Sequence, residues 1–175
     1  MKLAVFLDRD GVINKPVIKQ GQPYSPRRFD EFTLIDGVAE CLLRLRLAGW
    51  LNIIVTNQPD ISRGIIAPQV LNAINQQIED TLAVDDIVVC PHDDTDNCDC
   101  RKPRSGMLLK AAQKWNINLS KSFMIGDRWK DAEAGKEAGC ITILIDYPYN
   151  AGAKADFRVS DLSSAVELIL RNEDK

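Results

Sequence analysis

The chain has 175 residues, 45% of them hydrophobic, and its 22 basic and 25 acidic side chains give a formal net charge of -3. This length fits one domain over residues 1–175, and the charge gives no electrostatic argument for a nucleic acid or a membrane surface as a partner. No apolar segment approaches the ~20 residues that span a bilayer, and the N-terminal apolar run is broken at Asp8 with no cleavage site after it, so we expect a cytoplasmic protein.

Short apolar strands alternate with amphipathic helices along the chain. In chain order, the pattern predicts a strand at 3–7, a polar loop with three prolines at 15–30, a helix at 37–48, a strand at 51–55, a helix at 68–82, a strand at 87–89, a cysteine-bearing loop at 91–103, a helix at 106–115, a strand at 123–125, a helix at 131–138, a strand at 141–145 and a helix at 161–171 capped by Asp161 or Ser163. This alternation predicts an α/β fold with a mostly parallel sheet that helices cover on both faces.

Two carboxylates, Asp8 and Asp10, stand where the first predicted strand runs into Gly11. Side chains alternate along a strand, so both can point the same way if the extended backbone continues. Like charges held that close repel each other, unless a cation lies between them or one of them is protonated. The pair therefore indicates a metal site, a carboxylate nucleophile, or both.

Three further polar segments follow predicted strands or the cysteine-bearing loop. They are Thr56-Asn57-Gln58, Arg101-Lys102-Pro103, and the run from Gly126-Asp127-Arg128 to Asp131. In a parallel sheet the carboxyl ends of the strands share one edge, where ligands bind. Carboxylates suit Mg²⁺ there, while cations and hydroxyls suit phosphoryl oxygens. Each segment alone could be a turn or a solvated pair, and the order of all four carries the interpretation.

The loop at 91–103 and the end of the strand before it supply three thiols and the chain's one imidazole, on Cys90, His92, Cys98 and Cys100. Four protein ligands of this kind form the tetrahedral set of a structural zinc site. The alternative is a surface loop with reduced thiols, which the polar residues around it make less favourable. Cys41 and Cys140 lie in apolar patterns and are expected to be buried.

Taken together, the motifs DRDGV, TNQ, RKP and GDRxxD resemble the haloacid dehalogenase superfamily of phosphatases over nearly the whole chain. The cysteine and histidine elements resemble a zinc-bearing branch of that superfamily, whose members act on heptose bisphosphate or on histidinol phosphate. The resemblance implies a three-layer Rossmann-like fold with a small zinc-binding loop at about residues 90–103. The spacing between the motifs leaves no room for a large cap domain.

The resemblance also implies roles for the motif residues. Asp8 is then the nucleophile that forms an aspartyl-phosphate, and Asp10 is the general acid and base. Mg²⁺ is held by Asp8, by Asp10 through its backbone carbonyl, and by Asp127. The phosphoryl group and the substrate are bound by Thr56, Asn57, Arg101, Lys102 and Arg128, with Lys102 balancing the phosphoryl charge.

Three functions stay open from the sequence. The leading one is a Mg²⁺-dependent phosphatase for a small phosphorylated sugar, heptose bisphosphate first. The second is the same chemistry on histidinol phosphate, and the third is a phospho-acceptor signalling module. Residues 15–19 and 59–64 depart from the branch's pattern at the substrate end, which puts the leaving group in doubt. Arg27, Arg28 and Arg63 could contact a second phosphate or be solvated, and the protein is expected to be a monomer.

Overall fold

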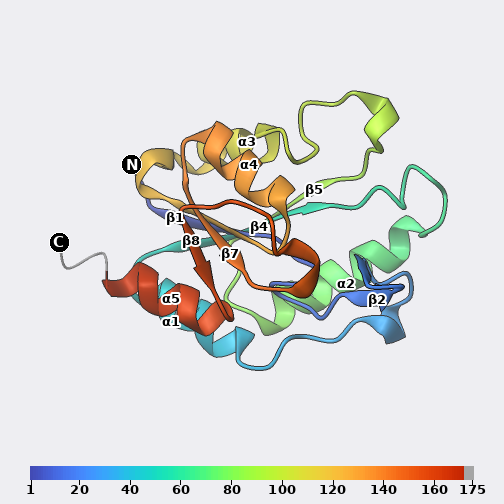
Figure 1. Cartoon of the computed structure of the whole chain (residues 1–175), viewed down its shortest axis with the longest axis horizontal. Coiled ribbons are helices and arrows are strands. Elements are labelled where there is room, and N and C mark those ends of the chain that lie inside the picture. Colours follow the sequence, from blue (N-terminus) through green and yellow to red (C-terminus); the bar gives the residue numbers. More distant parts are fainter. Residues whose placement is uncertain (172–175) are drawn as a thin grey trace.

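The computed structural model describes residues 1–171 and places six parallel strands in one sheet, in the order β5-β4-β1-β6-β7-β8 (Figure 1). The strands are β1 (Ala4–Leu7), β4 (Leu51–Asn57), β5 (Asp86–Cys90), β6 (Phe123–Gly126), β7 (Ile141–Ile145) and β8 (Phe157–Val159). Every pair in this sheet is parallel. Near-continuous apolar runs such as β1 fit the centre of a sheet that is buried on both faces.

Helices cover both faces of the sheet, as Figure 1 shows, which gives the predicted three-layer α/β fold. The first face packs against α1 (Val38–Leu47), α2 (Pro68–Thr81) and α5 (Leu162–Arg171), and the second against α3 (Gly106–Trp115) and α4 (Trp129–Ala138). Within the described residues, no helix combines the length and the apolar character needed to cross a membrane.

The predicted polar loop at 15–30 is wrong in one respect, because it contains an antiparallel hairpin. This hairpin joins β2 (Val17–Lys19) to β3 (Gln22–Tyr24). Gln20 and Gly21 both adopt positive φ angles, 50° and 74°, as the two central residues of a tight hairpin turn do. Each strand has three residues, too few for a clear alternation of polar and apolar positions. The short strand β8 was not predicted for the same reason.

The topology brings four chain segments to one edge of the sheet. Strand β1 lies between β4 and β6, and β5 lies beyond β4. Because these strands are parallel, their carboxyl ends share an edge, and Asp8, Asn57, Cys90 and Asp127 stand at or directly after those ends. This is the edge where open α/β sheets bind their ligands.

Candidate active site

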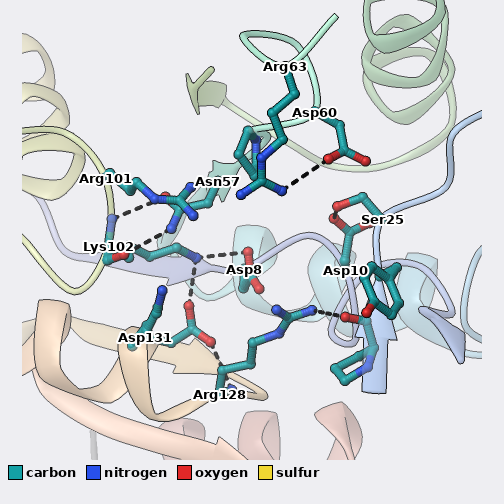
Figure 2. A pocket seen from close by; sticks show the side chains of 14 residues that line it. Asp8, Asp10, Ser25, Asn57, Asp60, Arg63, Arg101, Lys102, Arg128 and Asp131 are labelled. Carbon is teal, nitrogen blue, oxygen red and sulfur yellow. Dashed lines mark hydrogen bonds and ion pairs between the residues drawn. The ribbon is translucent and has the colours of Figure 1, made fainter. Parts of the chain in front are cut away.

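A polar cavity of about 250 Å³ opens at this edge of the sheet (Figure 2). Six of the residues predicted to act there line it, namely Asp8, Asp10, Asn57, Arg101, Lys102 and Arg128. Two others, Thr56 and Asp127, are 1% and 0% exposed and are not among the residues that line it. The structure therefore brings the four motifs together, as their positions after parallel strands predict.

Lys102 is the buried cation of the site. Its Nζ lies 2.8 Å from Asp8 Oδ1 and 2.6 Å from Asp131 Oδ1, as Figure 2 shows, and donates to the Val55 carbonyl at 2.8 Å. Burial alone would lower the pKa of Lys102, but the charges of Asp131 and Asp8 raise it above its ordinary value. The lysine therefore stays protonated and places a positive charge beside Asp8.

The pKa of Asp8 is raised to about 6. Burial is the largest cause, Lys102 opposes it, and the negative charges of Asp131 and Asp10 add to it. Asp8 is therefore mostly ionised at neutral pH, as a nucleophile requires, although Lys102 does not fully offset its burial. A divalent cation beside these carboxylates would lower the pKa further.

Asp8, Asp127 and Asp131 form a set of three buried carboxylates whose ligand atoms lie within 4.8 Å of one another. Burial and the charges of Asp8 and Asp131 raise the pKa of Asp127 well above its ordinary value. Asp127 Oδ1 is buried and has no hydrogen-bond partner in the part of the chain that the structure describes. Mg²⁺ prefers carboxylate oxygens, and an unpartnered buried carboxylate oxygen is a ligand position. The donor set therefore fits the expected magnesium ion.

Two glycines allow the carboxylates to approach each other. A Cβ on Gly11 would lie 2.3 Å from Asp127 Oδ2, and Gly11 also has a φ of 93°. A Cβ on Gly126 would lie 2.1 Å from the Cβ of Asp131. Any larger residue at either position would displace a carboxylate of the set. The glycines after β1 and at the end of β6 are thus required by the packing of the site.

Asp10 faces a different set of partners. Its carboxylate accepts hydrogen bonds from Arg9, from Asn14 at 3.0 Å, from Ser25 at 2.7 Å and from Gln58 at 2.9 Å. Burial raises the pKa of Asp10, but the Arg9 charge and these donors outweigh it, so the pKa lies below its ordinary value. Asp8 and Asp10 are therefore not equivalent, since one carboxylate lies in the acidic set and the other among donors.

The two residues at the end of β4, Thr56 and Asn57, have different hydrogen-bond partners. Asn57 exchanges two hydrogen bonds with the backbone of Lys102, at 3.0 and 3.1 Å. Thr56 Oγ1 accepts a hydrogen bond from Gln58 at 2.9 Å and keeps its own proton to donate. Contact of either residue with a phosphoryl group stays a prediction.

The two predicted arginines are tied to loops beside the cavity. Arg101 donates to the side chain of Asp94 at 2.7 Å and to the His92 carbonyl at 3.1 Å. Arg128 donates to the Pro23 carbonyl of the β2–β3 hairpin at 2.8 Å. Both side chains line the cavity in these positions, so the cysteine-bearing loop and the hairpin hold them there.

Several residues of the site had no assigned role in the sequence interpretation, among them Ser25, Gln58, Asp60 and Asp131. Asp131 had a signal, since it is the last residue of GDRxxD and falls one helical turn after Asp127. Its Oδ2 also accepts the backbone N–H of Arg128 at 2.9 Å, which starts α4 at Trp129 rather than at 131 as predicted. Ser25 had none, because it lies in a segment read as a polar loop.

The arginines considered for a second phosphate have carboxylate partners. Arg27 Nε lies 2.8 Å from Asp60 Oδ2, and Arg63 lies 3.3 Å from Asp60 Oδ1. Arg63 also donates two hydrogen bonds of 2.6 Å to Asp93 of the cysteine-bearing loop. Arg28 pairs with Asp30 at the surface. Asp60 and Arg63 line the cavity. Arg28 is exposed to solvent, which is the alternative considered for it from the sequence.

The four residues Cys90, His92, Cys98 and Cys100 gather their ligand atoms within 4.8 Å. The Cys90–Cys98 sulfur distance and the Cys90–His92 distance from sulfur to Nδ1 are both 3.7 Å. Cys100 Sγ lies 3.1 to 3.4 Å from the ligand atoms of the other three residues. A Zn–S distance of about 2.3 Å in a tetrahedron places neighbouring ligands about 3.7 Å apart. The set fits Zn²⁺. Cys41 and Cys140 are buried elsewhere, as predicted.

The chain is similar to known proteins in both sequence and fold. The family model for haloacid dehalogenase-like hydrolases matches residues 22–139. A D-glycero-beta-D-manno-heptose-1,7-bisphosphate 7-phosphatase of Pasteurella multocida is 40% identical over 149 residues, covering 79% of this chain and 78% of that protein. A D-glycero-D-manno-heptose-1,7-bisphosphate 7-phosphatase of Thermosynechococcus vestitus is 32% identical over an alignment of 191 positions. The match covers 95% of this chain and 94% of that protein.

A solved structure extends the similarity over the whole fold. The D,D-heptose 1,7-bisphosphate phosphatase of B. bronchiseptica, complexed with magnesium and phosphate, superposes with a TM-score of 0.84. It shares 30% sequence identity, and the match covers 98% of this chain and 99% of that one.

Proposed function

Because this chain belongs to the family of haloacid dehalogenase-like hydrolases, we propose that it is a Mg²⁺-dependent phosphatase that cleaves a sugar phosphate through an aspartyl-phosphate on Asp8. One observation carries the proposal. Asp8 lines the cavity with the Lys102 ammonium 2.8 Å from its carboxylate and lies within the acidic set of Asp127 and Asp131. A carboxylate between a fixed cation and a cation site suits attack on a phosphoryl group, where catalysis is mostly positioning and charge stabilisation.

The substrate we propose is D-glycero-D-manno-heptose 1,7-bisphosphate, cleaved at the 7-phosphate. Support comes from the relatives, which carry that activity in their names and match more than three quarters of the chain. The cavity is also polar and lined by charges of both signs, which suits a hydroxylated and phosphorylated ligand. Histidinol phosphate is the alternative substrate to exclude.

In the first step, a carboxylate oxygen of Asp8 attacks phosphorus while the bond from phosphorus to the sugar oxygen breaks. Asp10 gives its proton to the departing sugar oxygen, so the sugar leaves as an alcohol. Lys102 and Thr56 are proposed to stabilise the transferring phosphoryl oxygens. Asp8, Asp127, Asp131 and the Asp10 carbonyl would hold Mg²⁺, which would lower the pKa of Asp8 and offset the negative charge of the phosphoryl group.

In the second step, Asp10 removes a proton from water, and the water oxygen attacks the phosphorus of the aspartyl-phosphate. The bond from phosphorus to Asp8 breaks, and inorganic phosphate is released. The donors around Asp10 favour the ionised form that this step needs. The first step needs the protonated form, and the approach of a phosphoryl dianion favours it, because a like charge raises the pKa of a carboxyl group.

We further propose that Cys90, His92, Cys98 and Cys100 bind a structural Zn²⁺. Four protein ligands leave no open position for chemistry. The loop has no apolar core of its own, and it leads directly to Arg101 and Lys102. The role of zinc would be to fix these two cations at the cavity. The cytoplasmic location, the single domain and the monomeric state remain proposals, and sedimentation equilibrium would test the last of them.

The test is a phosphate-release assay with Mg²⁺ on both heptose 1,7-bisphosphate anomers and on histidinol phosphate. We expect turnover of heptose bisphosphate, no activity for Asp8→Asn, and a severely slowed Asp10→Asn. Asp36→Asn is the matched control, because the Asp36 side chain is fully exposed. Full activity in the Asp8 or Asp10 variant would refute the mechanism. A lasting phosphorylated Asp8 without turnover would favour the signalling module instead.

A further inference from the structure

The segment after β7 reaches across the carboxyl edge of the sheet and contacts the site. Pro148–Asn150 form a single 3-10 turn. Within it, Asn150 Nδ2 donates to the backbone carbonyl of Asp127 at 2.6 Å and to that of Ile145 at 2.7 Å. The Tyr149 hydroxyl donates to Asp127 Oδ2 at 2.6 Å. Asp127 is thus held both by its backbone and by its carboxylate.

We propose that Tyr149 is a positioning residue for the magnesium site, which fixes Asp127 so that Oδ1 is presented to the ion. This inference rests on the magnesium site of the proposed function. The supporting observation is that the two carboxylate oxygens of Asp127 have different surroundings. Oδ2 accepts a hydrogen bond from the phenol, while Oδ1 is buried without a hydrogen-bond partner among residues 1–171.

The surroundings leave Asp127 little freedom to turn. Gly11 packs so closely that a Cβ there would lie 2.3 Å from Oδ2, on the oxygen that the phenol holds. Asp8 and Asp131 each have a carboxylate oxygen within 4.8 Å of one of Asp127, and both are negatively charged when ionised. Without a donor behind it, the Asp127 carboxylate would be pushed away from them by charge repulsion. The phenol offsets that repulsion by a hydrogen bond and keeps the carboxylate in place.

The ring of Tyr149 is itself fixed. It stacks on Tyr147 with ring centroids 5.0 Å apart and an interplanar angle of 8°. The Tyr147 hydroxyl donates to the carbonyl of Gly11 at 3.1 Å, and among the described residues it makes no hydrogen bond to Asp8, Asp127 or Asp131. Partners behind a metal ligand orient it before the metal arrives, and their loss typically weakens metal affinity or activity 10- to 100-fold. Tyr147 offers a matched comparison, since it is the same residue type in the same stack.

The experiment measures binding of Mn²⁺, as a paramagnetic substitute for Mg²⁺, by electron paramagnetic resonance on protein dialysed free of Mg²⁺. Tyr149→Phe keeps the ring and removes the hydroxyl, and we expect it to raise the Mn²⁺ dissociation constant by about tenfold. Tyr147→Phe is expected to change it by less than about twofold, and Asp127→Asn to abolish binding. In activity assays, Tyr149→Phe should need more Mg²⁺ for half-maximal rate but approach the wild-type kcat at saturating Mg²⁺.

Equal Mn²⁺ affinity in wild-type protein and Tyr149→Phe would overturn the inference. An equal loss in Tyr147→Phe would also overturn it, because the effect would then belong to the stack. Wild-type protein that binds no Mn²⁺ would refute the magnesium site and the inference with it. Failure to hydrolyse heptose bisphosphate would refute only the proposed substrate and would leave the inference about Tyr149 standing. If Tyr149→Phe does not fold, tyrosine difference absorption of wild-type protein replaces it: no change on saturation with Mg²⁺ would overturn the inference.

Discussion

Asn57 and Lys102 hold each other through two hydrogen bonds. Asn57 Nδ2 donates to the Lys102 carbonyl at 3.0 Å, and Asn57 Oδ1 accepts the backbone N–H of Lys102 at 3.1 Å. The two residues are 45 positions apart, so the end of β4 fixes the backbone from which the Lys102 side chain extends to Asp8. The amide therefore acts on the site through the lysine it holds.

Replacement of Asn57 by alanine should displace Lys102 from the nucleophile. The lost pair of partly buried hydrogen bonds is worth about 1–3 kcal/mol, and we expect kcat/KM to fall about tenfold or more. Steady-state phosphate release would measure this. Asn72→Ala is the control, because Asn72 is exposed on α2. An unchanged kcat/KM for Asn57→Ala would show that Lys102 needs no such support.

Loss of the proposed zinc should weaken substrate binding more than it harms the nucleophile. The cysteine-bearing loop holds Arg101 through Asp94 and the His92 carbonyl, whereas Asp8 belongs to β1. We expect Cys98→Ser to raise KM several-fold, to retain Asp8 phosphorylation, and to lower thermal stability. Zinc content by atomic absorption must accompany the kinetics. Normal KM and stability in a verified zinc-free variant would contradict this role, and Cys41→Ser controls for the loss of a thiol.

Asp60, which lines the cavity with Arg63, should weaken the binding of a second phosphate there. Its carboxylate, in a residue only 7% exposed, lies between Arg27 and Arg63 and pairs with both. Asp60→Asn keeps the shape and removes the negative charge. We expect KM for a heptose bisphosphate to fall about threefold relative to KM for a heptose monophosphate. A ratio of the two KM values that does not change would separate Asp60 from substrate selection.

Asp86 should make the folding stability depend on pH in the acid range. Burial raises its pKa, but hydrogen bonds from Lys114 and from the Trp115 indole, both 2.8 Å, bring it below the ordinary value of 3.8. A group with a lowered folded-state pKa stabilises the fold above its ordinary pKa, and that stabilisation is lost as the pH falls through the folded value.

Asp86→Asn should therefore lower the free energy of unfolding by about 1 kcal/mol near pH 7. The difference from wild type should shrink as the pH falls below 3.8. Urea unfolding at a series of pH values would measure it. The exposed Asp36→Asn serves as the control. A difference that stays constant down to acid pH would assign the loss to packing rather than to the charge.

The sheet and its helices could be predicted because their apolar patterns are long. The predicted strand 3–7 and β1 differ by one residue, and the final helix begins after the Asp161 cap as expected, with Asp161 accepting the Ser164 N–H at 2.7 Å. The β2–β3 hairpin was missed because its strands have three residues each. The early start of α4 depends on the hydrogen bond from the Arg128 backbone N–H to the Asp131 side chain. A pattern of apolar residues cannot predict that bond.

The location of the site was predictable, while its contacts were not. Parallel strands bring their carboxyl ends to one edge, which predicts that Asp8 and Asp127 meet. The partners come from packing between segments far apart in the chain, as with Ser25 on Asp10 and Tyr149 on Asp127. Neither serine nor tyrosine carries a pattern that would reveal such a contact.

The central place of β1 in the sheet has a consequence for synthesis of the protein. β1 pairs with β6 over a sequence separation of more than a hundred residues, for instance Val5 with Phe123. During translation, Asp8 therefore leaves the ribosome exit tunnel before Asp127 and Asp131 have been synthesised. Non-local pairing of this kind forms late and slowly. An unfinished chain would carry the nucleophile without its magnesium site, so the enzyme would be inert until most of its length has been translated and folded.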